Sequence, residues 1–217
     1  MAVLARVLMA CLAMAISPTV NATAQASDLL IVEGQEFALN TNPLETQLEQ
    51  KQWKPPEDAV RSSANWRGYI ATWEIKDDKL FLKDVSIRVR DPKEERKYLR
   101  KSITNELYPG ATEVFADWYT GALIVPDGEM THYVHMGYGS SFDHYQVFRV
   151  RSGEVVEHLS MTGVEFEAYK EKKFAAFRKT DTYAKAYADF RKQAPDLNEA
   201  LAEGFIKSFY AENYLSQ

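Results

Sequence analysis

Short apolar runs separated by turn residues fill residues 27–161, and this pattern predicts β-strands. The first two runs, Leu29 to Val32 and Gln35 to Leu39, are separated by Glu33-Gly34. Residues 41–63 are polar and contain three prolines, so we expect mainly a loop there.

Two hairpins are predicted around the dipeptides Asp77-Asp78 and Ser152-Gly153. Each dipeptide is flanked by runs in which apolar and polar residues alternate, so one face of each strand is apolar. The second hairpin places Arg151 opposite Glu154, a favourable cross-strand pair. The predicted strands are 69–75 with 80–89, and 146–151 with 154–161.

A third hairpin is predicted at Pro126-Asp127-Gly128, between Val114 to Val125 and Met130 to Tyr138. Its register gives one mostly apolar face that we expect in the core, with Trp118, Ala122, Ile124, Met130, His132, Val134 and Met136. The opposite face is aromatic and titratable, and we expect it exposed, with Asp117, Tyr119, Gly121, Leu123, Tyr133 and His135.

Apolar residues three to four positions apart predict helices over residues 162–217. Asp181 can cap the second of three helices, Pro195 ends it, and Asp196 supports the start of the third. A further short helix is predicted over Lys93 to Leu107, with its cations on a solvated face. The expected fold is α+β: an antiparallel meander of six to eight strands, an open sheet or a partial barrel, followed by C-terminal helices packed on it.

The first residues have the order of a secretory signal peptide: Arg6, then the ten apolar residues 7–16, then small residues at alternating positions. Cleavage is expected after Ala24 or Ala26, which leaves a β domain over 27–161 and a helical extension over 162–217. The run is half as long as a membrane span of roughly 20 residues. We therefore expect a periplasmic or secreted protein.

Cys11, the only cysteine, lies within the predicted signal peptide. It is preceded by residues that resemble a lipid-attachment box, but only four residues separate it from Arg6, too few for an apolar core. Its removal would leave a mature chain without disulfides or thiol chemistry.

The mature chain also loses Arg6, which changes the net charge from −5 to −6. An acidic balance argues against general nucleic-acid binding and against attachment to an anionic membrane surface.

Four segments resemble a group of small uncharacterised bacterial proteins. They are Asn42-Pro43-Leu44-Glu45, the WRGYIATWEI sequence of residues 66–75, Asp117-Trp118-Tyr119-Thr120-Gly121, and the YVHMGYG sequence of residues 133–139. The resemblance spans residues 29–160, so the helices are an addition to it. It implies no activity and no catalytic residue.

The expected exposed face suggests one kind of chemistry. Asp117, Tyr119 and His135 could form an acid/base set, because histidine transfers protons near neutral pH and a carboxylate can orient it. The alternative is that His135 only hydrogen-bonds a tyrosine or the backbone. No nucleophile is marked by a G-x-S-x-G motif.

Arg67, Tyr69 and Trp73 alternate along one strand and share a side. An arginine beside two aromatic rings suits a planar, anionic or sugar-like ligand. The same residues also fit a core strand that ends in an ion pair.

We expect no cofactor and no metal. His132 and His135 point to opposite sides of a strand, so they cannot bind one zinc ion from there. A site would need them to converge with His144 and His158, which lie elsewhere in the sequence.

The pattern favours an exported, non-enzymatic binding or interaction protein of unknown ligand or partner. Its predicted ligand-binding residues are Arg67, Tyr69, Tyr119, Tyr133 and His135. One alternative is a hydrolase-like enzyme that uses Asp117 and His135. Another is an immunity or inhibitor protein that covers a protein partner.

Overall fold

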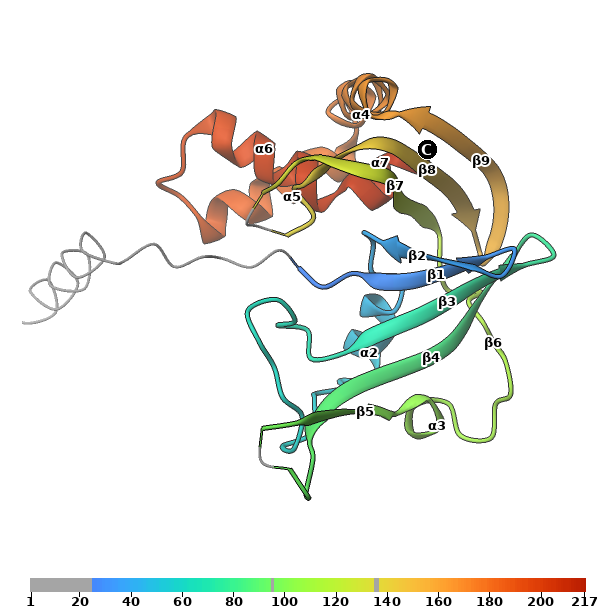
Figure 1. Ribbon diagram of the computed structural model, residues 1–217. Coiled ribbons are helices and arrows are strands. Elements are labelled where there is room, and N and C mark those ends of the chain that lie inside the picture. The colour runs from blue at the N-terminus through green and yellow to red at the C-terminus, as the bar shows by residue number, and fades with distance from the viewer. Residues whose placement is uncertain (1–24, 95, 135–136) are drawn as a thin grey trace, which may run out of the picture.

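The computed structural model describes residues 25–94, 96–134 and 137–217 and shows an α+β fold (Figure 1). These residues form one mixed nine-stranded open sheet and six helices. The strands are β1 (Asp28–Val32), β2 (Gln35–Leu39), β3 (Ile70–Lys76), β4 (Lys79–Arg90), β5 (Tyr98–Ser102), β6 (Val114–Phe115), β7 (Gly121–His132), β8 (Ser141–Arg151) and β9 (Glu154–Thr162). The helices are α2 (Glu45–Gln50), α3 (Thr104–Leu107), α4 (Gly163–Phe177), α5 (Asp181–Gln193), α6 (Glu199–Phe209) and α7 (Ala211–Leu215).

The strand order is β2-β1-β3-β4-β9-β8-β7, and β5 and β6 also pair with β4. The expectation of a purely antiparallel meander is wrong, because β1 runs parallel to β3. Parallel neighbours need a long connection. Antiparallel β2 returns the chain to the start of β1, and residues 40–69 then cross from the end of β2 to the start of β3. The helices are also not all C-terminal, since α2 and α3 precede β7.

Both two-residue hairpins are confirmed. Asp77 and Asp78 have φ values of 50° and 55°, as the tight turn between β3 and β4 requires. Arg151 pairs with Glu154 across the Ser152-Gly153 turn between β8 and β9.

The helix predicted over Lys93 to Leu107 is wrong. The segment forms β5, which pairs with β4, and only the short α3 follows it. Arg100 of β5 lies opposite Arg88, and its Nε and Nη2 atoms donate to Ser86 Oγ at 3.1 and 2.9 Å. Pairing with the free edge of β4 therefore outweighs the helical pattern of this segment.

The hairpin predicted at residues 126–128 is also wrong, because β7 continues through them and pairs with β8. The register shifts between Asp127 and Met130, where Gly128 has a φ of 94°. Asp143 Oδ1 accepts the Glu129 N–H at 2.8 Å, and a Cβ on Gly128 would lie only 2.1 Å from that oxygen. The turn residues therefore make a β-bulge.

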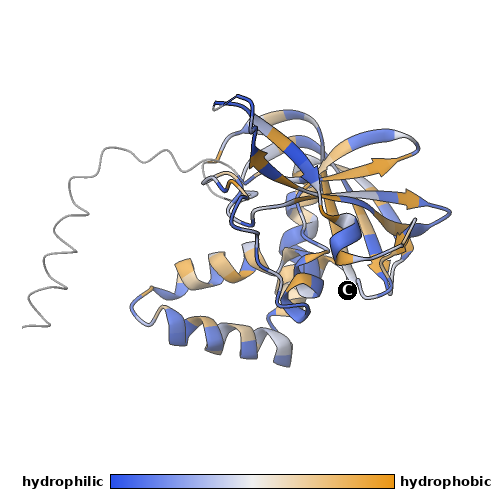
Figure 2. Ribbon diagram, turned by 90° about the horizontal axis from the view of Figure 1, so that it is seen from below, coloured by the Kyte–Doolittle hydropathy of each residue, from blue (hydrophilic) through white to orange (hydrophobic). Residues whose placement is uncertain are grey.

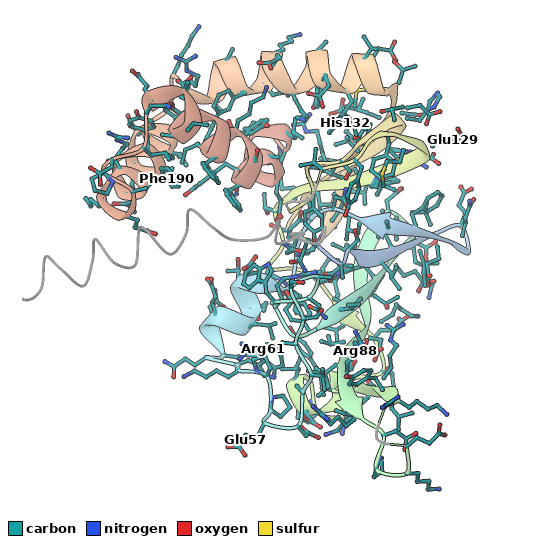
Figure 3. All side chains as sticks on the ribbon, turned by 60° about the vertical axis from the view of Figure 1, so that its left-hand side comes forward. Glu57, Arg61, Arg88, Glu129, His132 and Phe190 are labelled. Atoms are coloured by element: carbon teal, nitrogen blue, oxygen red, sulfur yellow. The ribbon has the colours of Figure 1, made fainter. Side chains whose placement is uncertain are left out.

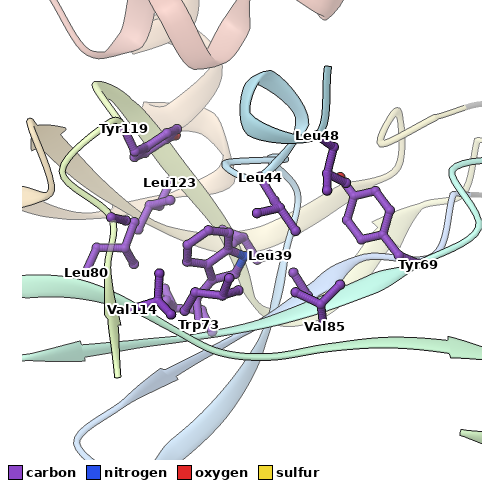
Figure 4. Packing of buried hydrophobic residues seen from close by; sticks show 14 of the residues in the cluster. Leu39, Leu44, Leu48, Tyr69, Trp73, Leu80, Val85, Val114, Tyr119 and Leu123 are labelled. Carbon is purple, nitrogen blue, oxygen red and sulfur yellow. The ribbon is translucent and has the colours of Figure 1, made fainter. Parts of the chain in front are cut away.

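Two buried clusters lie on opposite faces of β7. Leu123 and Val125 belong to the larger cluster, which also holds Trp73 of β3, whereas Ala122 and Ile124 pack against the C-terminal helices. Figure 4 shows Tyr119 beside Leu80 and Leu123 in the larger cluster. The strands and helices carry both apolar and polar residues (Figure 2). Both faces of β7 are buried from Gly121 to Val125, so Gly121 and Leu123 do not form the exposed face that was predicted there.

The helices α4 to α7 gather on the side of β7 and β8 (Figure 1). Thr162 and Glu165 form a capping box at the start of α4. The prediction that Asp181 caps the second helix is wrong, because Thr180 caps α5 and Asp181 lies in its first turn; Asn198, two residues after Asp196, caps α6. In the described residues, every helix is too short or too polar to cross a membrane.

Candidate functional site

A buried ion pair joins the start of β1 to the segment before β3. Asp28 Oδ1 lies 3.1 Å from Arg67 Nη2, and both side chains are almost fully buried. The same carboxylate accepts the Ala71 N–H at 3.1 Å and the Trp73 indole N–H at 3.3 Å. Burial raises the pKa of Asp28, while Arg67 and these two donors oppose the rise.

Asn42 extends this ion pair into a larger polar cluster. Its Oδ1 atom accepts from Arg67 Nη1 at 2.5 Å and from the Tyr138 hydroxyl at 2.9 Å. Its backbone N–H donates to Glu212 Oε2 on α7 at 3.3 Å. The polar cluster, by which we mean Asp28, Asn42, Arg67, Tyr138 and Glu212, therefore spans the N-terminal strand, three connections and the last helix.

The carboxyl group of Glu212 is buried, and burial disfavours its ionised form. Burial raises the pKa of its carboxyl to about 7, although the Asn42 N–H and the Tyr119 hydroxyl oppose the rise. The Tyr119 hydroxyl donates to the Ala122 carbonyl at 3.2 Å. Because this hydroxyl has one proton, it donates either to the Ala122 carbonyl or to the ionised Glu212 carboxylate.

A cleft of about 400 Å³ lies on the other side of Arg67, between α2 and residues 66–69. Trp66 is 60% exposed beside it, and Arg67 and Tyr69 are buried at 6% and 3% exposure. Figure 4 shows Leu48 of α2 next to the Tyr69 ring, so packing fixes one wall of the cleft. The cleft is lined by Glu45, Leu48, Glu49, Gln52, Trp53, Lys54, Pro55, Trp66, Arg67 and Tyr69.

The cleft brings aromatic rings and carboxylates together. Trp53 and Tyr69 meet edge to face with ring centroids 5.9 Å apart, and the Arg67 guanidinium lies 4.9 Å from the Tyr69 ring centroid. Burial raises the pKa of Glu45, and Glu49 one turn later raises it further, while Arg67 lowers it. Rings of this kind can hold a flat or cationic ligand, and the carboxylates can accept its hydrogen bonds.

The structure separates the residues predicted to bind a ligand. Arg67 and Tyr69 line the cleft, whereas Tyr119 packs in the core and Tyr133 is exposed after the end of β7. His135 lies outside the described residues, and Asp117 is exposed. Figure 3 shows His132 near α4, far from Arg61 on the loop that follows α2.

Glu45, Trp53 and Trp66 were not predicted as site residues. Glu45 and Trp53 lie in the segment expected to be a loop, where Leu44 and Leu48 at a spacing of four do mark the short helix α2. That spacing was the signal that could have placed a helix there, with Glu45 and Glu49 together on an adjoining face.

The four segments for which the sequence suggested a resemblance contribute residues to the polar cluster and its neighbours. Asn42, Arg67 and Tyr138 come from three of them, and Tyr119 from the fourth hydrogen-bonds Glu212. The Trp118 indole N–H also donates to the Pro43 carbonyl at 3.1 Å. Polar contacts therefore join these segments in the folded protein.

Three or more histidine, cysteine, aspartate or glutamate side chains do not converge as a metal site anywhere in the described residues. No family model, curated protein or solved structure matches the chain.

We predict that Arg67→Met lowers the free energy of unfolding by about 3–5 kcal/mol, because it leaves the Asp28 carboxylate buried without a cation. Adding Asp28→Asn should recover part of this loss, since the amide carries no charge. Chemical denaturation of both variants measures the difference. Lys76→Met is the control, because its pair with Glu113 is exposed and should contribute less than about 1 kcal/mol. A double variant less stable than Arg67→Met would contradict the role of the ion pair.

We predict that Glu212 makes the protein less stable as the pH rises from about 4.5 to about 7. Its pKa is higher in the folded than in the unfolded chain, so the folded chain binds more protons in this range and loses stability as they leave. Glu212→Gln should remove this fall and stabilise the protein at pH 8 by about 3 kcal/mol. Denaturation at several pH values compares it with Glu36→Gln on an exposed strand. Identical pH profiles for the parent protein and Glu212→Gln would show that Glu212 ionises freely.

Proposed function

We propose that the chain is an exported, non-enzymatic binding protein, periplasmic or secreted, whose site is the cleft between α2 and residues 66–69. The exposed Trp66 beside this cleft carries the proposal. A tryptophan that leaves 60% of its surface in water beside a concave site offers a ring on which a ligand can stack.

Two further properties support this choice. The volume of about 400 Å³ falls within the range of small-molecule sites, and the lining combines apolar rings with a few polar groups. Arg67 and Tyr69, which were predicted to bind a ligand, both line it. Their buried contacts fix the cleft before a ligand arrives, which reduces the entropy lost on binding.

Export is supported by the order of residues 1–26, and the contacts of Ala26 bear on where the signal would be cut. Ala26 donates its N–H to the Ala64 carbonyl at 2.6 Å, and its own carbonyl accepts from Arg67 Nη2 at 2.9 Å. Cleavage after Ala26 would remove that acceptor from a buried guanidinium, whereas cleavage after Ala24 would keep it. We therefore place the processing site after Ala24.

We predict that the protein recovered from an exporting cell begins at Gln25. Intact mass spectrometry and N-terminal sequencing of the secreted or periplasmic fraction test this directly. A mature chain that begins at Ser27 would contradict the proposed cut, and a mass that includes Met1 would contradict export.

We predict that Trp66→Ala weakens binding of a cleft ligand about tenfold, equivalent to roughly 1.4 kcal/mol of lost stacking, and leaves stability within about 0.5 kcal/mol. A thermal-shift screen with sugars, nucleotides and amines first finds a compound that stabilises the protein, and calorimetry then measures its affinity. Phe209→Ala on α6 is the control, because this ring is 72% exposed and does not line the cleft. Equal affinity in the parent protein and Trp66→Ala, or a loss confined to Phe209→Ala, would move the site elsewhere.

A further inference from the structure

We infer that the cleft binds an organic ammonium ion, a protonated amine attached to a ring or an alkyl chain. This inference rests on the proposed function, because it assigns a ligand class to the same cleft. Three observations carry it: two carboxylates without a cation, aromatic rings on the same walls, and a buried tyrosine hydroxyl without a well-aligned hydrogen bond.

Glu45 and Glu49 lie one turn apart on α2, and both line the cleft. Like charges at this spacing repel one another and destabilise a helix. Within the described part of the chain, neither carboxylate forms an ion pair. A cation bound between the two carboxylates would attract both of them and so offset their mutual repulsion.

The positive groups at the cleft do not neutralise both of these carboxylates. Arg67 is already paired with Asp28 at 3.1 Å, so its charge is balanced by a carboxylate outside the cleft lining. Lys54 also lines the cleft, but it is exposed and the structure gives it no ion pair. With Asp28 and Arg67 cancelling, the lining keeps two negative groups and one positive group, and therefore favours a cation.

The aromatic residues suit the same ligand. Trp53, Trp66 and Tyr69 line the cleft, and ring faces attract ammonium groups through their negative quadrupole. Tryptophan gives the strongest attraction of this kind. A ligand with a ring or alkyl chain next to its charge would contact both the rings and the carboxylates.

The Tyr69 hydroxyl supplies the third observation. Tyr69 is 3% exposed and lines the cleft, and its hydroxyl oxygen makes no well-aligned hydrogen bond among the described residues. Burial raises the pKa of this hydroxyl, and the Arg67 guanidinium lies close enough to oppose the rise. A buried polar atom left unpaired costs about 1–3 kcal/mol. This oxygen is covered in the free protein. A shift of the Tyr69 side chain on binding would let the N–H of a protonated amine donate to it, which a quaternary ammonium cannot do.

Calorimetric titration with benzylammonium and with benzyl alcohol tests the inference, because the two probes share a ring and differ in charge. At pH 7.5 and low salt, we expect benzylammonium to bind about tenfold more tightly. Glu45→Gln and Glu49→Gln should each weaken benzylammonium several-fold and leave benzyl alcohol unchanged. Glu36→Gln, an exposed carboxylate on β2 that does not line the cleft, should alter neither.

The outcomes separate this inference from the proposed function. Equal affinity for the two probes, or a neutral sugar that binds while benzylammonium does not, would overturn the ligand class but keep the cleft as a binding site. Loss of charge preference in both glutamate variants would support the class. Failure of every amine, sugar and nucleotide to bind would overturn the inference and the proposed function together.

Discussion

The buried carboxylate of Asp28 is the constraint on which this structure depends. An ionised group without water needs partners on every side, and Asp28 obtains them from Arg67, Ala71 and Trp73. These partners fix the start of β1 against β3 and so establish the parallel pair that makes the sheet mixed. The same contacts hold Arg67 between the polar cluster and the cleft, so the architecture and the proposed site share one interaction.

The Arg67 side chain contacts two different parts of the protein, and the contacts have different consequences. Toward the protein interior it bonds Asn42, which leads to Tyr138 and to Glu212 on the last helix. Toward α2 it supports Tyr69 and the wall of a cleft whose carboxylates have no cation. The contacts toward the interior hold the fold together. In the cleft, carboxylates remain without a cation, and a ligand can supply one. A preformed binding site needs walls that are fixed by packing and polar groups that are free to bind a ligand.

Local pattern predicted the local structure well. The tight turns at Asp77-Asp78 and Ser152-Gly153, and the capped C-terminal helices, depend on residues close together in the sequence. The bulge at Gly128 was missed because Pro-Asp-Gly suits a turn equally well, and only Asp143 from the neighbouring strand decides between them. That error changed which face of β7 was expected to be exposed. Arg67 and Tyr69 were identified from their alternation, whereas Glu45 and Trp53 join them only through tertiary packing.

Hydrogen exchange at the two N–H groups that bind Asp28 tests the central claim most directly. In a ¹⁵N-labelled sample, the Trp73 indole N–H and the Ala71 amide should exchange only on global unfolding, because both donate to a fully buried carboxylate. The indole N–H of the exposed Trp66 provides a fast internal reference. Slow exchange at both positions is the predicted result. Exchange of the Trp73 indole as fast as that of Trp66 would mean that Asp28 does not hold β1 in place.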